Sequence, residues 1–145
     1  MRVAHVIQGR KAQLIVMVFV MALGLLIVSG VASALQWNLV WNTIDEEATL
    51  FGNGQGAFVT GPVECTEGGR VAIRVEVTQG ATTGTGSFRA PCTGEEQEWA
   101  VSVVVRGSGK FEPGPATATA WAVVGGRQHA TDDSEWTEGI VLVAR

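Results

Sequence analysis

The residues best suited to chemistry lie close together near the C-terminus. His129 is followed by Asp132, Asp133 and Ser134, which are the residue types of a hydrolase whose histidine base, oriented by an aspartate, activates a serine nucleophile. The sequence contains no Gly-x-Ser-x-Gly elbow to present such a serine. We therefore predict that the chain is not an enzyme and has no catalytic residue, with a secreted hydrolase using His129 as the alternative.

Acidic clusters are the remaining candidates for a metal site. They lie at residues 45–47, 95–98 and 132–135, and none matches the twelve-residue calcium loop of an EF-hand. A glycosidase carboxylate pair cannot be singled out from fourteen acidic residues. Two cysteines without further ligands cannot complete a zinc tetrahedron. We interpret the clusters as solvated charge that keeps the protein soluble, and we predict no metal and no cofactor.

Glycines and tryptophans offer weaker signals of binding. The run Gly52-Asn53-Gly54-Gln55-Gly56 superficially resembles a nucleotide-binding loop, but no helix follows it, so we predict a turn. Trp99 and Trp121 alternate with small apolar residues, which indicates core or sheet-covering positions. Trp136 stands among polar residues and is the aromatic side chain that we expect to contact a partner.

An export signal precedes all of these residues. Arg2, Arg10 and Lys11 are followed by an apolar run from Leu14 to Val28 and then by Ala32-Ser33-Ala34, a small-x-small cleavage site. We predict cleavage after Ala34, which would leave 111 of the 145 residues as one secreted or extracytoplasmic domain.

A retained membrane anchor is the alternative to cleavage. Residues 12–35 could form a longer hydrophobic helix, with Trp37 and Trp41 at the membrane interface. The chain would then be a single-pass membrane protein with its C-terminal domain outside. The uninterrupted apolar run is shorter than the roughly 20 residues that span a membrane, which favours cleavage. No cysteine ends the leader, so the chain is not a lipoprotein.

Charge narrows the choice of partner. Loss of the three basic leader residues takes the net charge from −4 to −7. Nucleic acid binding depends on Lys and Arg that neutralise phosphates, so we exclude nucleic acid as a partner. We expect an unidentified protein or glycan at the cell surface, with membrane contact only through the N-terminal helix if that helix is kept.

Alternating apolar residues predict strands throughout the exported part. The clearest example is Val71, Ile73, Val75 and Val77 against a polar opposite face. Helix signals are absent after residue 35. We expect seven strands, separated by glycine-rich turns, in an all-β, immunoglobulin-like antiparallel β-sandwich over residues 47–145. The predicted strands are residues 48–51, 57–65, 71–79, 82–89, 99–105, 116–124 and 138–143.

Two stretches are harder to place. Residues 35–46 could form a linker, a first strand or a membrane-proximal stem, and we leave these alternatives open. Residues 126–136 are polar enough for a long surface loop before the last strand.

The two cysteines test the predicted strand order. An even cysteine count in an exported chain favours a disulfide between Cys65 and Cys92. If residues 71–79 and 82–89 pair as a hairpin turning at Gly80, the numbers of paired residues sum to about 161, and those of the cysteines sum to 157. The cysteines would then meet at the open end of the hairpin. Such a bridge should stabilise the fold by about 3 to 4 kcal/mol.

A resemblance supports the same expectations. The chain resembles small secreted two-cysteine β-rich proteins of unknown function from Gram-positive bacteria. The likeness covers residues 56–143 and implies export, a disulfide and a sandwich, but it supplies no catalytic residue. It rests on Cys65, residues 77–80, Gly84-x-Gly86, Cys92-Thr93-Gly94, Trp99, Phe111-x-Pro113-Gly114-x-Ala116 and residues 140–143.

Overall fold

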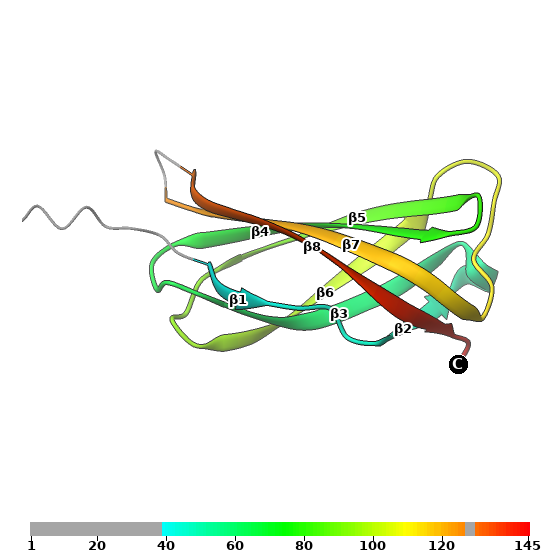
Figure 1. Cartoon of the computed structure of the whole chain (residues 1–145), viewed down its shortest axis with the longest axis horizontal. Coiled ribbons are helices and arrows are strands. Elements are labelled where there is room, and N and C mark those ends of the chain that lie inside the picture. The colour runs from blue at the N-terminus through cyan, green and yellow to red at the C-terminus, as the bar shows by residue number, and fades with distance from the viewer. Residues whose placement is uncertain (1–38, 127–129) are drawn as a thin grey trace, which may run out of the picture. The chain divides into compact units, whose positions relative to one another are not determined.

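The computed structural model describes residues 39–126 and 130–145, which form an all-β fold (Figure 1). All seven predicted strands are present, and within the described ranges an eighth precedes them. A short turn, η1 (Gly52–Gly54), links the second and third strands. The strands are β1 (Leu39–Asn42), β2 (Glu47–Phe51), β3 (Gly56–Cys65), β4 (Arg70–Gln79), β5 (Thr82–Pro91), β6 (Glu96–Val105), β7 (Gly114–Gly125) and β8 (Ala130–Val143).

The sheet closes on itself into a seven-stranded barrel. Its strand order is β1-β3-β2-β8-β7-β4-β5-β6, and β3 also pairs with β6. Since β1 and β2 follow one another along the same edge of β3, they occupy one position in the ring. The predicted immunoglobulin-like sandwich is therefore wrong. Strands of both architectures alternate between a buried and an exposed face, so the apolar pattern does not distinguish them.

Glycines inside the strands allow a neighbouring strand or a core side chain to approach the backbone closely. A Cβ atom on Gly86 of β5 would overlap a methyl group of Val101 and the carbonyl of Ser102 on β6. A Cβ on Gly61 of β3 would lie 2.8 Å from the indole ring of Trp99. Glycine in a strand commonly marks a tight bend or a close backbone approach, and both positions fit that role.

Side chains fill the barrel interior. Trp99 is almost fully buried, and its Nε1 donates to Asn42 Oδ1 at 3.1 Å and to the Pro62 carbonyl at 3.2 Å. Phe111 covers one end of the core and is 2% exposed. Among the described residues the fully buried positions carry no charged or polar side chain. Small barrels of about this strand number have interiors that side chains can fill, and this one is a packed core.

The predicted hairpin and disulfide are confirmed. β4 pairs with β5 from Arg70↔Pro91 to Gln79↔Thr82, so the numbers of paired residues sum to 161. Cys65 and Cys92 form a disulfide with a Cα–Cα distance of 5.4 Å. The bond joins the end of β3 to the residue after β5.

Two stretches that the sequence left uncertain contain strands. Residues 39–42 form β1, paired with β3. The surface loop predicted for residues 126–136 is wrong, because β8 begins at Ala130. The polar residues at the start of β8 are extended because their backbone pairs with that of β7, from Val124↔Asp132 to Ala120↔Trp136.

The N-terminal predictions fall on residues that the structure does not describe. The hydrophobic leader, its helix and the cleavage site at Ala32 and Ala34 all lie outside the described residues. In residues 39–126 and 130–145, no helix has the length and hydropathy needed to cross a membrane.

Candidate functional site: a groove at one end of the barrel

A groove of about 570 Å³ lies at the barrel end that Phe111 covers. The loop after β6 and the C-terminus lie at this same end of the molecule (Figure 1). Three segments distant in sequence line the groove: residues 50–54, residues 110–113 and residues 144–145.

The η1 turn supplies one wall through an unusual backbone conformation. Gly52, Asn53 and Gly54 all have positive φ, at 60°, 54° and 87°. Glycine adopts such angles without steric cost, and asparagine tolerates them better than most residues. Gly54 also lies so close to Phe111 that a Cβ atom would overlap the Phe111 carbonyl oxygen. The Phe111 amide donates to the Gly54 carbonyl at 2.7 Å, which fixes the two walls against each other.

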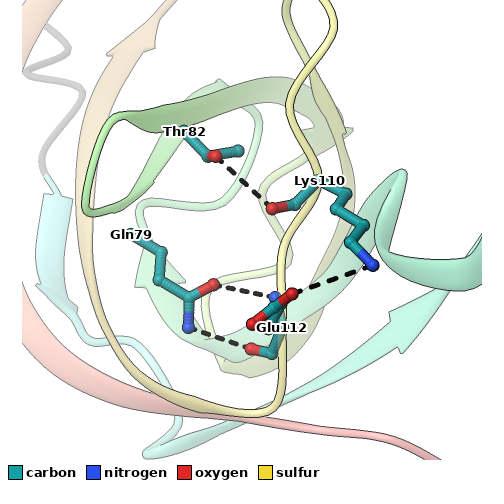
Figure 2. Close-up of polar contacts among 4 residues, drawn as sticks. All are labelled: Gln79, Thr82, Lys110 and Glu112. Carbon is teal, nitrogen blue, oxygen red and sulfur yellow. Dashed lines mark hydrogen bonds and ion pairs between the residues drawn. The ribbon is translucent and has the colours of Figure 1, made fainter.

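The opposite wall is a strap formed by residues 106–113. Gln79 at the end of β4 binds both the backbone N–H and the backbone carbonyl of Glu112 in this strap (Figure 2). Its Oε1 accepts the Glu112 amide at 2.8 Å, and its Nε2 donates to the carbonyls of Glu112 at 2.9 Å and Pro115 at 3.2 Å. Thr82 adds a longer hydrogen bond to the Lys110 carbonyl at 3.4 Å. The strap is therefore anchored to the β4–β5 turn.

The groove surface is more polar than apolar, and charged side chains lie at its rim. Leu50 and Phe51 are among the apolar side chains that line it, while Phe111 packs in the core beneath and is 2% exposed. Lys110 and Glu112 form an ion pair at 3.7 Å, but both side chains are more than 60% exposed, so the pair adds little stability. Arg145 adds a second cation. Among the described residues that line the groove there is no serine, threonine, cysteine or histidine that could act as nucleophile or imidazole base.

The residues of the alternative hydrolase reading lie elsewhere. Asp132 is on β8, where its Oδ2 accepts the backbone amide of Leu39 at 3.0 Å and so links β8 to β1. Asp133 and Ser134 are successive exposed residues of β8 and point to opposite faces of the strand. His129 lies outside the described residues.

The tryptophans occupy three different environments. Trp99 is in the core, as the alternation predicts. Trp121 is half-buried on the outer face of β7, with the Arg74 guanidinium 5.6 Å from its ring centroid, so it covers the sheet. Trp136, the predicted partner contact, is half-buried and packs against the core from β8. Its Nε1 is buried and has no hydrogen-bond partner among the residues that the structure describes.

The acidic clusters are not arranged as ligands in the part of the chain that the structure describes. No group of three or more His, Cys, Asp and Glu side chains there is positioned to hold a metal ion. Asp45 instead accepts a hydrogen bond from the Thr60 hydroxyl.

The sequence did not point to the groove. Residues 52–56 were predicted as a turn and residues 107–114 carry turn-forming glycines and a proline, but nothing in their composition shows that the two segments meet. The signal available in the sequence was Phe111, an aromatic residue that stands between two short turn sequences, Gly107-Ser108-Gly109 and Pro113-Gly114. Comparison with known proteins adds no further assignment, since no protein-family model matches the chain and no curated protein matches it.

Proposed function

We propose that this chain is an exported, non-enzymatic binding module that uses the end groove to hold a segment of a partner protein at the cell surface. The observation that carries the proposal is the groove itself: a concave, mainly polar surface with Leu50 and Phe51 in its lining, a charged rim, and two walls tied together by hydrogen bonds. Binding sites are commonly concave and largely preformed. A preformed site also avoids the entropic cost of ordering on binding.

Export is the second part of the proposal. The disulfide between Cys65 and Cys92 is compatible with an oxidising compartment. The resemblance to small secreted two-cysteine proteins of Gram-positive bacteria agrees with it. Mass spectrometry of the protein recovered from cells should show loss of residues 1–34 and a mass two protons below that of the reduced domain. A protein that keeps its leader and resists carbonate extraction from membranes would support the anchored alternative instead.

A site-specific cross-linker tests the groove. Lys110 is suited to carry a photoreactive side chain, because its own side chain is 65% exposed and its one described ion pair is weak. Val123, 39% exposed on β7, is the matched control position away from the groove. We expect a discrete cross-linked partner in envelope preparations from position 110 and none from position 123. Equal labelling from both positions would contradict a binding role for the groove.

The hydrolase alternative has its own test. If His129 were a catalytic base, hydrolysis of ester, peptide or glycan substrates would disappear in His129→Ala. We expect no turnover by the unsubstituted protein.

A further inference from the structure

An uncharged face lies on the outside of the barrel beside the groove. Val104 on β6 is 53% exposed and Phe58 on β3 is 46% exposed. The ring of Phe51 on β2 lies 4.6 Å from that of Phe58 and lines the groove as well. The residue paired with Val104 is Gly56 and the residue paired with Phe58 is Ser102. Both partners are small residues, so they leave Phe58 and Val104 prominent on this face. We name Phe51, Phe58, Ser102 and Val104 the apolar face.

Opposite charges lie at the two ends of the apolar face. Side chains on one face of a strand recur every second residue, so the outer side of β6 and its continuation carries, in order, Glu98, Ala100, Ser102, Val104 and Arg106. Both Glu98 and Arg106 are exposed. Within the described residues neither forms an ion pair, and Arg106 donates instead to the Thr85 hydroxyl at 2.9 Å.

The spacing of these charges makes the face complementary to itself. Arg106 and Glu98 are each four residues from Ser102, or about 13 Å along the strand. A two-fold axis that lies in the interface above Ser102, parallel to the sheet and perpendicular to β6, would place Arg106 of one copy opposite Glu98 of the other, and the same pair would form twice. A chain with a net charge of −4 repels itself over most of its surface, so a face with balanced charge is the suitable place for self-contact.

We propose that two copies of this chain associate through the apolar face, with Phe58 and Val104 at the centre and two Arg106–Glu98 pairs at the rim. Together with its charged ends, from Glu98 to Arg106 and across three strands, the contact surface measures about 26 Å by about 15 Å, or about 400 Å² per copy. That is about half of what each partner buries in an average specific interface, so the dimer is weak and its dissociation constant lies above the micromolar range. Exposed rim charges are screened by salt, so the dimer also weakens as ionic strength rises.

Sedimentation equilibrium of the protein as cells deliver it tests the dimer. Between about 10 μM and 1 mM protein we expect a monomer–dimer equilibrium, with a dissociation constant at least about five-fold higher in 500 mM than in 50 mM NaCl. Phe58→Asp should abolish the dimer, while Val123→Asp, the same charge at an exposed position on β7, should leave it unchanged. A protein that stays monomeric at 1 mM in low salt would overturn the proposal.

Charge reversal provides the second test. Arg106→Glu places glutamate opposite Glu98 and should weaken dimerisation at least about ten-fold. The double variant Arg106→Glu with Glu98→Arg restores opposite charges and should recover the original dissociation constant. Failure of the double variant to recover it, in a protein that retains its disulfide and its near-ultraviolet circular dichroism, would rule out the two-fold arrangement. Cross-linking from position 110 reports on the groove and is independent of either result.

Discussion

At the scale of single residues, Trp99 shows how the packed core accommodates a polar atom. The indole is almost fully buried, yet its N–H reaches two acceptors, Asn42 Oδ1 and the Pro62 carbonyl. Burial of an unpaired donor costs free energy, so this pair of contacts makes a tryptophan acceptable inside the barrel. The same contacts tie β6 to β1 and β3.

Replacing Trp99 by phenylalanine should therefore destabilise the protein. Trp99→Phe keeps an aromatic ring but leaves two acceptors without their donor and removes buried volume, so we expect a loss of about 2 to 3 kcal/mol in the free energy of unfolding. Urea unfolding with the disulfide intact measures the change. Trp121→Phe, on the outer face of β7, should cost less than about 1 kcal/mol. Equal losses at the two positions would contradict the role given to the buried N–H.

The space around two strand glycines, Gly86 and Gly139, predicts opposite effects of adding a side chain. Gly86→Ala should lower the free energy of unfolding by about 1 to 3 kcal/mol, because its Cβ would meet Val101 and the Ser102 carbonyl on the next strand. Gly139 on β8 has open space around the corresponding position. Gly139→Ala should therefore be neutral or slightly stabilising. Thermal unfolding of the two variants gives the comparison, and a neutral Gly86→Ala would show that β5 and β6 can separate without cost.

At the scale of elements, the strap over residues 106–113 depends on one side chain from β4. Gln79 makes two hydrogen bonds to it, one of them from the Glu112 amide, and a third to Pro115 at the start of β7. Gln79→Ala should speed hydrogen exchange of the Glu112 amide by about ten-fold, which corresponds to one hydrogen bond of about 1.4 kcal/mol. Gln97→Ala removes hydrogen bonds to Pro91 and Thr93 elsewhere in the barrel and should leave that amide unaffected.

Strands could be predicted from the sequence because each signal is local. Alternation at Val71, Ile73 and Val75 reports one buried face, and the hairpin register follows from one turn at Gly80. Closure could not be predicted in the same way, because the pairing of β3 with β6 joins segments about 40 residues apart and leaves the alternation unchanged. Polar residues 132–135 were misplaced for a related reason: they extend β8 only because β7 offers a long partner strand.

At the scale of the whole molecule, the barrel is closed by pairing between successive strands. We expect it to open first between neighbouring strands that share few residue pairs. β4 pairs with β5 over ten residue pairs and β3 with β6 over nine, whereas β2 and β8 share three parallel pairs and β5 and β6 share only Gly84↔Val105 and Thr85↔Val104. These two pairs lie near the groove end. Toward the other end β5 and β6 are no longer paired, and there the disulfide joins the end of β3 to the residue after β5.

The disulfide should therefore determine the integrity of the ring as well as the entropy of the unfolded chain. Its sequence separation of 27 residues gives an expected stabilisation of about 3 to 4 kcal/mol. In the double variant Cys65→Ala with Cys92→Ala, we expect that loss in urea unfolding and faster hydrogen exchange at the start of β6 than in the β4–β5 hairpin. The hairpin is the internal control, because its ten residue pairs do not depend on closure. If exchange rose uniformly in both regions, the disulfide would act on the unfolded chain alone and the β5–β6 seam would not be the weak link of the barrel.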